Sequence, residues 1–163
     1  MTKLTDLINR AKACKQCPTS LSREQINLLQ TLLEINFSND FIEITERYIY
    51  ECLYGAYIEF YSLYNKDLHY SGVVEQTLVF RRKLFLPDRY VLLSDMGDAG
   101  AVFMETQDSP NKPSPVIYCD QMDVDSIIKE QPLKYNPTIW PSFTDFFEYL
   151  VEQEEAMLKE QEK

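Results

Sequence analysis

Residues 90–106 read YVLLSDMGDAGAVFMET. Two stretches rich in apolar, β-branched and aromatic residues flank the sequence GDAG at 97–100, and such glycine spacing is typical of a turn between strands. A third apolar stretch, at 115–119, follows a proline-rich segment that begins at residue 108. Three short strands joined in succession favour antiparallel pairing. We therefore predict strands at 90–94, 101–106 and 115–119.

Helical patterns lie on both sides of this central stretch. Ser22 and Gln25 form the sequence signature of a capping box, and Ser142 precedes an apolar stripe with i, i+3, i+4 spacing. The longer predicted helices cover residues 22–33, 38–53, 71–86 and 142–152, with a polar tail after Glu152. We further expect a short N-terminal helix and a short helix near 124–128. The aromatic-rich residues 56–64 predict an additional strand.

These elements predict a single α+β domain with a mostly antiparallel central sheet and flanking helices. The length of 163 residues and the hydrophobic fraction of 45% suffice for one core. We divide the chain into an N-terminal extension at 1–20, the domain at 21–155 and a polar tail at 156–163. The chain has no apolar run near the ~20 residues of a membrane span and no signal-like N-terminus. We therefore expect a soluble, cytoplasmic protein that does not associate with membranes.

The four cysteines are at positions 14, 17, 52 and 119. They lack the density of a secreted disulfide scaffold, and Cys52 and Cys119 lie in apolar patterns, where a free thiol behaves as a small hydrophobe. Cys14 and Cys17 have CxxC spacing, but a structural zinc site needs more ligands, and a redox CxxC usually follows a strand. We predict no metal and no cofactor, with a zinc protein kept as an alternative.

The sequence does not favour catalysis. Acyl transfer requires a base beside a nucleophile, and the only histidine, His69, lies in a polar segment, where a lone histidine is usually structural or solvated. Neither GxxxxGKS/T nor GxGxxG is present, so residues 97–100 are interpreted as a turn and not as a phosphate-binding loop. We predict a protein that is not an enzyme.

The formal net charge of −10 argues against nucleic-acid binding, because phosphate neutralisation requires clustered Lys and Arg. The excess is local, since residues 95–125 carry −6, residues 148–163 carry −4 and the remainder balances. The second segment is interpreted as the solvated outer face of the last helix.

The acidic residues of 95–125 are the candidate binding surface. Pairs of these carboxylates could hold a hard cation, but the spacing of an EF-hand loop is absent. Two interpretations stay open: a rim that maintains solubility, and a docking surface for a basic protein, because charge complementarity steers association. The candidate partner-binding residues are Asp95, Asp98, Glu105, Asp108, Asp120, Asp123 and Asp125.

Several motifs, in their order along the chain, carry a family resemblance. They are VEQTLVFR at 74–81, LPDRYVLLSDMGD at 86–98, VFMET at 102–106, SPVIYCD at 114–120 and SFTDFFEYL at 142–150. In this order they resemble the SUKH superfamily, also called the Smi/Knr-like domain. The resemblance covers about residues 21–155. The sequence FSNDF at 37–41 departs from the LPxxY pattern that opens the early helix of that family, and residues 1–20 have no counterpart.

The resemblance implies an α+β fold built on a mostly antiparallel sheet, and it brings no catalytic residues. Many members neutralise a toxin, often a nuclease, delivered by the same or a neighbouring strain. A nuclease presents positive charge to its substrate, so an acidic patch can occupy that surface. The leading hypothesis is an immunity protein, monomeric or weakly dimeric, that neutralises a cognate toxin with a basic surface. The alternative is a non-enzymatic regulatory adaptor that binds a cellular protein.

Overall fold

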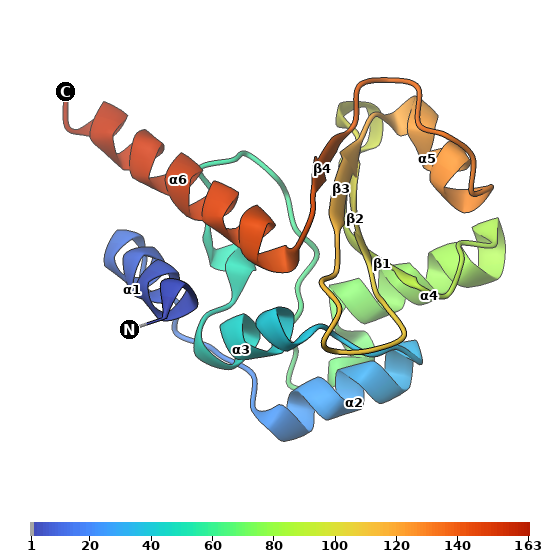
Figure 1. Ribbon diagram of the computed structural model, residues 1–163, viewed down its shortest axis with the longest axis horizontal. Coiled ribbons are helices and arrows are strands. Elements are labelled where there is room, and N and C mark those ends of the chain that lie inside the picture. The colour runs from blue at the N-terminus through green and yellow to red at the C-terminus, as the bar shows by residue number, and fades with distance from the viewer. Residues whose placement is uncertain (1) are drawn as a thin grey trace.

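Four antiparallel strands form the centre of the fold, in the order β1-β2-β3-β4 (Figure 1). The computed structural model describes residues 2–163. The strands are β1 (Tyr90–Asp95), β2 (Ala101–Glu105), β3 (Val116–Cys119) and β4 (Thr138–Trp140). The α+β class and the three predicted strands are confirmed. The edge strand β4 was not predicted, because its three residues lie between two prolines and show no alternation long enough to identify a strand.

Helices cover both faces of the sheet, with α6 on one side and α4 and α5 on the other (Figure 1). The α-helices are α1 (Lys3–Cys14), α2 (Arg23–Leu33), α3 (Asn39–Arg47), α4 (Gly72–Leu84), α5 (Gln121–Ile128) and α6 (Phe143–Gln161). Short 3-10 turns are η1 (Tyr50–Cys52), η2 (Leu68–Tyr70) and η3 (Gly97–Ala99).

The two faces of the sheet contribute to two separate hydrophobic clusters. Val102 and Met104 point into the larger cluster, which contains the buried stripes of α1, α2, α3 and α6. Phe103 points the opposite way, against α5 and the residues after α4. This alternation follows from the two-residue period of a strand. A register shift between Leu92 and Ser94 marks a bulge in β1.

The predicted start signals at Ser22 and Ser142 are confirmed. Ser22 and Gln25 form a reciprocal capping box, and the Ser142 hydroxyl accepts a hydrogen bond from the Asp145 N–H at 3.1 Å. The apolar stripe of α6 is fully buried. However, α6 continues to Gln161, well beyond the predicted end near Glu152, and its C-terminal half lies against α1 (Figure 1).

Two predictions for residues 38–64 were wrong. The helix predicted to reach Leu53 ends at Arg47, because Tyr48, Ile49 and Tyr50 are all buried and one helix face cannot bury three successive residues. Residues 56–64 do not form a strand. The Tyr61 N–H donates to the Leu93 carbonyl of β1 at 2.8 Å, but the carbonyls of Glu59 and Ser62 accept from other groups instead of a strand ladder.

The cysteine prediction also requires correction. Cys17 and Cys52 form a disulfide, because η1 places Cys52 beside the segment that follows α1, with a Cα–Cα distance of 5.9 Å. Cys14 and Cys119 are free. Residues 2–163 contain no group of three His, Cys, Asp or Glu side chains suited to a metal ion. None of the helices described has the length and apolar character needed to cross a membrane.

Candidate partner-binding surface

Three of the predicted acidic residues meet at one end of the sheet, which we call the acidic end (Asp95, Asp98 and Asp120). Asp95 pairs with Ala101, Ala101 pairs with Cys119, and Asp120 follows directly. Asp98 lies in η3, the turn between β1 and β2. Asp98 and Asp120 are exposed and Asp95 is half-buried. The hairpin connection therefore brings together residues that are up to 25 positions apart in the sequence.

The electrostatics around Cys119 agree with this arrangement. Burial of the Cys119 thiol, and then the nearby carboxylates of Asp123, Asp120 and Asp95, raise its pKa to about 12. A thiolate would have to form inside a buried site surrounded by negative charge. Cys119 is therefore a protonated packing residue and not a reactive thiol.

Asp123 and Asp125 have different surroundings although they lie on the same helix, α5. Asp123 is fully buried, and its carboxylate accepts hydrogen bonds from the backbone N–H groups of Lys134 at 2.9 Å and Tyr135 at 2.8 Å. This carboxylate fixes the loop between α5 and β4 and does not reach the surface. Asp125 is exposed and forms an ion pair with Lys129 at 2.6 Å.

Glu105 and Asp108 lie at the opposite end of the sheet, because β2 runs away from the acidic end. Glu105 forms an ion pair with Arg89 at 3.0 Å, and Asp108 forms one with Lys112 at 2.7 Å. Lys112 is the single lysine of the segment 95–125. Both acids therefore have a cationic partner, which sequence counting could not reveal.

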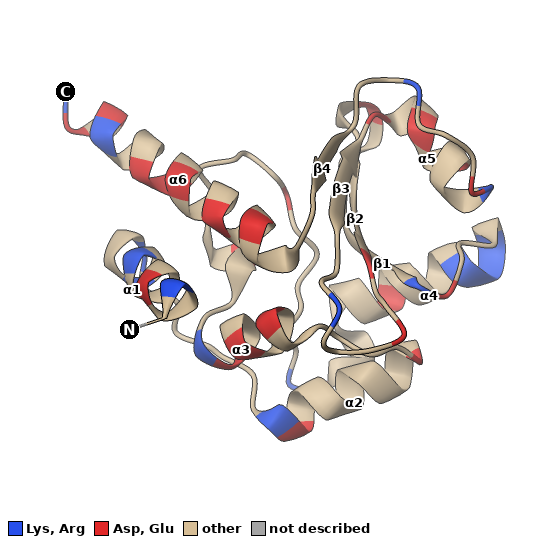
Figure 2. Ribbon diagram, viewed as in Figure 1, with Lys and Arg blue, Asp and Glu red and all other residues tan. Residues whose placement is uncertain are grey.

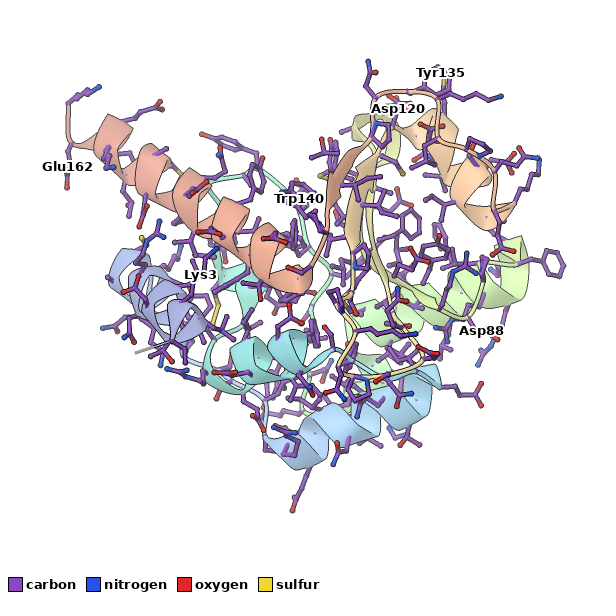
Figure 3. The ribbon with its side chains drawn as sticks, in the orientation of Figure 1. Lys3, Asp88, Asp120, Tyr135, Trp140 and Glu162 are labelled. Atoms are coloured by element: carbon purple, nitrogen blue, oxygen red, sulfur yellow. A yellow bond between two sulfur atoms is a disulfide. The ribbon has the colours of Figure 1, made fainter. Side chains whose placement is uncertain are left out.

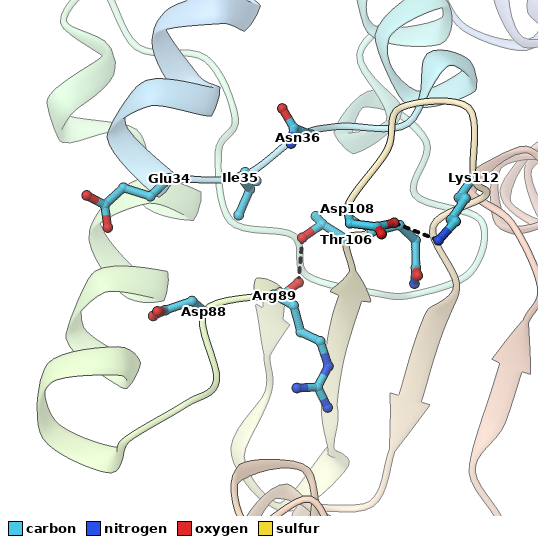
Figure 4. Close-up of a pocket in the computed structure, with 9 residues that line it drawn as sticks. Glu34, Ile35, Asn36, Asp88, Arg89, Thr106, Asp108 and Lys112 are labelled. Atoms are coloured by element: carbon cyan, nitrogen blue, oxygen red, sulfur yellow. Dashed lines mark hydrogen bonds and ion pairs between the residues drawn. The ribbon is translucent and has the colours of Figure 1, made fainter.

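Asp108 and Lys112 line an open cleft of about 500 Å³, with Glu34, Asp88 and Arg89 (Figure 4). The Arg89 guanidinium points away from the Asp108–Lys112 pair, and the Thr106 hydroxyl donates to the Arg89 carbonyl at 2.8 Å (Figure 4). Acidic and basic groups thus share this cleft. The segment 95–125 forms two distinct sites and not one continuous surface.

The acidic residues of α6 are also less free than the sequence suggested. Figure 2 shows acidic residues along α6 and basic residues in the neighbouring α1. Lys3 forms an ion pair with Glu148 at 3.0 Å, and Arg10 binds both carboxylate oxygens of Glu155 at 2.9 Å. The solvated-face interpretation was therefore wrong for these two glutamates, because α1 supplies their counter-charges.

A pocket beside the acidic end was not predicted. It has a volume of about 330 Å³ and lies between residues 56–58, the β1–β2 turn, strands β3 and β4, and α6. The Trp140 side chain extends from β4 toward α6 (Figure 3) and forms part of the pocket wall. The aromatic enrichment of residues 56–64 was the available signal, but it predicted a strand. The pocket depends on contacts between segments that are distant in sequence.

His69, the single histidine, lies exposed in η2. Its Nδ1 atom is 2.8 Å from Oδ1 of Asp67, two residues earlier, and Asp67 also accepts the backbone N–H of His69. This local pairing closes a turn.

The sequence was also compared with known proteins. The model of the SMI1 / KNR4 family (SUKH-1) matches residues 20–149. The matched region begins just before α2, contains the whole sheet and ends within α6, so α1 lies outside it. No curated protein matches the chain.

Proposed function

The chain belongs to the SMI1 / KNR4 family (SUKH-1), and on this basis we propose that it is an immunity protein that binds and neutralises a cognate toxin. Many members of this family are toxin-immunity domains, which function by binding a protein. The proposal further assigns the toxin a basic surface. It also includes a cytoplasmic location and a monomeric or weakly dimeric state.

The observation that carries the proposal is that the acidic end lacks a cationic partner among the described residues, although Asp95 and Asp120 accept the backbone N–H groups of Gly97 and Met122. None of the ion pairs within residues 2–163 involves Asp95, Asp98 or Asp120. Glu105, Asp108 and Asp125, in contrast, each have a cationic partner. Carboxylates that reach the solvent without a cationic partner attract a cationic protein surface and increase its rate of association. We therefore restrict the proposed contact surface to Asp95, Asp98 and Asp120.

Co-purification with the product of an adjacent toxin-like gene tests the function directly. We expect a stable complex, and we expect cells that express this protein to survive the toxin. Binding of a cellular protein without any protection would contradict the immunity role and support the regulatory adaptor.

A triple charge reversal, Asp95→Lys, Asp98→Lys and Asp120→Lys, tests the surface. We expect the affinity for the toxin to fall by roughly 100-fold at low salt, since charge pairs across an interface contribute several kcal/mol together. The matched control reverses three exposed acids elsewhere, Glu75, Glu160 and Glu162. Equal losses in both triple variants would show that only net charge matters and would refute the surface assignment.

A further inference from the structure

Four of the eight residues that line the pocket beside the acidic end carry aromatic rings. Its lining includes Tyr57, Ile58, Met96, Tyr118, Trp140 and Tyr149, and none of the residues that line it carries a charge. A volume of about 330 Å³ is at the lower end of the range for ligand sites. The size suits one long side chain of a partner and not a large cofactor.

Three of the rings are held in place by their neighbours. The Trp140 ring lies 4.9 Å from the Phe146 ring and 5.0 Å from the Tyr149 ring, measured between centroids. The Tyr118 hydroxyl donates to the Ala99 carbonyl at 2.6 Å, which ties the pocket wall to the β1–β2 turn. A binding site with fixed walls loses little conformational entropy when it is occupied.

The remaining ring, that of Tyr57, stands at the rim in a costly conformation. Its φ angle is +54°, in the left-handed region, and its side chain is 80% exposed. This conformation is energetically unfavourable for a residue with a Cβ. Because the ring is exposed, burial of the side chain does not offset that cost. Strained residues of this kind concentrate at functional sites. The conformation holds an aromatic ring at the mouth of the pocket.

Acidic residues lie beside the walls of this aromatic pocket. The N–H of the exposed Glu59 donates to the Met96 sulfur at 3.5 Å, and the exposed Asp98 precedes Ala99, whose carbonyl accepts the Tyr118 hydroxyl. A cation that enters the pocket would therefore meet the faces of the rings inside and negative charge at the rim. Arginine fits better than lysine, because its planar guanidinium is weakly hydrated and stacks on aromatic faces.

We propose that this pocket binds an arginine side chain of the partner protein, with the aromatic rings around the guanidinium and the rim carboxylates supplying the counter-charge. The identity of the partner as a basic toxin rests on the proposed function. The chemical preference of the pocket does not, so it can be measured on the protein alone.

Trp140 is the only tryptophan in the chain, so its fluorescence reports on the pocket directly. The probe is N-acetyl-arginine methylamide, compared with the citrulline analogue, which has the same shape without the charge. We expect a saturable change in Trp140 emission with the arginine probe and a clearly weaker response to citrulline. No response to arginine, or equal responses to both probes, would overturn the proposal.

Tyr57→Gly provides a variant that should fold, because glycine accepts the left-handed conformation without strain. We expect it to weaken arginine binding about two- to fivefold, the contribution of one exposed cation–π contact, with an unchanged or higher midpoint of thermal unfolding. Phe85→Gly is the matched control, since Phe85 has a φ of +62° and is 81% exposed but does not line the pocket. If Tyr57→Gly binds arginine as tightly as Phe85→Gly does, the proposal fails.

These outcomes are independent of the proposed function. Arginine binding without protection against a toxin would remove the immunity role and leave the pocket assignment intact. Protection against a toxin by a protein whose pocket does not bind arginine would support the immunity role and refute the pocket assignment.

Discussion

The carboxylate of Glu154 accepts a hydrogen bond from the backbone N–H of Gly55 at 2.7 Å, across 99 residues of sequence. The same oxygen accepts the N–H of Tyr54 at 2.7 Å, and the Glu154 side chain is only 1% exposed. A glutamate in the buried face of α6 therefore fixes the chain that leads into residues 56–58, one wall of the aromatic pocket.

Replacement of Glu154 should destabilise the fold. Glu154→Ala leaves two buried N–H donors without an acceptor, so we expect the free energy of unfolding to fall by about 2–4 kcal/mol. Urea denaturation measures this loss. Glu152→Ala, an exposed neighbour on α6, should change it by less than about 0.5 kcal/mol. Equal effects of the two substitutions would contradict the anchoring role.

Gly55 is required for the close approach of this loop to α6. A Cβ at this position would lie 2.4 Å from the carbonyl carbon and oxygen of Gln153. Since these are backbone atoms, Gly55→Ala must displace the loop, and we expect a loss of stability of about 2 kcal/mol or more, together with a shift in Trp140 emission. Gly97→Ala is the control, because Gly97 has a φ of +58° but open space around it. It should cost only about 1–2 kcal/mol and leave the emission unchanged.

Asp123 should contribute to stability and not to partner binding. Asp123→Ala removes the acceptor for the Lys134 and Tyr135 N–H groups, and we expect a loss of about 2–4 kcal/mol in the free energy of unfolding. Asp125→Ala, on the exposed side of the same helix, should cost about 0.3–0.5 kcal/mol, the value of an i,i+4 pair. A variant at Asp123 that keeps full stability but loses the toxin would reverse this assignment.

The Cys17–Cys52 disulfide closes a loop with a sequence separation of 35. In the chain-entropy model such a crosslink stabilises the folded state by roughly 3–4 kcal/mol, so Cys17→Ser with Cys52→Ser should lower stability by that amount. Alkylation of the denatured, unreduced protein followed by mass spectrometry should label only Cys14 and Cys119. Disulfides are rare in reducing compartments. Alkylation of freshly lysed cells therefore also tests the cytoplasmic proposal, and four labels there would mean that the crosslink is absent in the cell.

Glu51 should make stability depend on pH. Burial is the largest cause that raises the pKa of Glu51 above its ordinary 4.5, against the opposing hydrogen bond from the Leu63 N–H. The folded state therefore binds the proton more tightly, and the stability that this contributes is present below pH 4.5 and is lost as the pH rises through the folded pKa. Glutamine does not titrate, so the Glu51→Gln variant does not lose stability through this group as the pH rises. We expect its stability relative to the parent to increase as the pH is raised from about 4.5 to 7, and a constant difference over that window would contradict the assignment.

The sequence predicted the central elements well because their signals are local. Ser22, Ser71 and Ser142 all cap helices, and the turn at 97–100 joins β1 to β2. The three strands of the meander are buried on both faces, so they appear in the sequence as short, nearly continuous apolar runs between turn residues. The end of α3 and the non-strand conformation of residues 56–64 depend on contacts with segments distant in sequence. Local sequence patterns do not indicate such contacts.

The candidate site was predictable only in composition. The excess of acidic residues in segment 95–125 is visible in the sequence, but the direction of the strands determines which of these residues lie close together. β2 carries Glu105 and Asp108 away from Asp95 and Asp98, and the hairpin returns Asp120 to their side. Asp123 lies on the buried face of the 8-residue helix α5, where its carboxylate accepts the backbone N–H of Lys134 in the following loop. The sequence pattern alone does not show this contact. The aromatic pocket required the packing of Tyr57 near Trp140, which no sequence spacing indicated.

The edge strand β4 has a consequence for the behaviour of the protein in concentrated solution. An open strand edge is a template on which another chain can extend the sheet. Here Pro137 and Pro141 bracket the three residues of β4, and proline has no N–H to donate to an added strand. The exposed Ile139 thus stands on an edge too short and too poor in donors to start edge-to-edge aggregation.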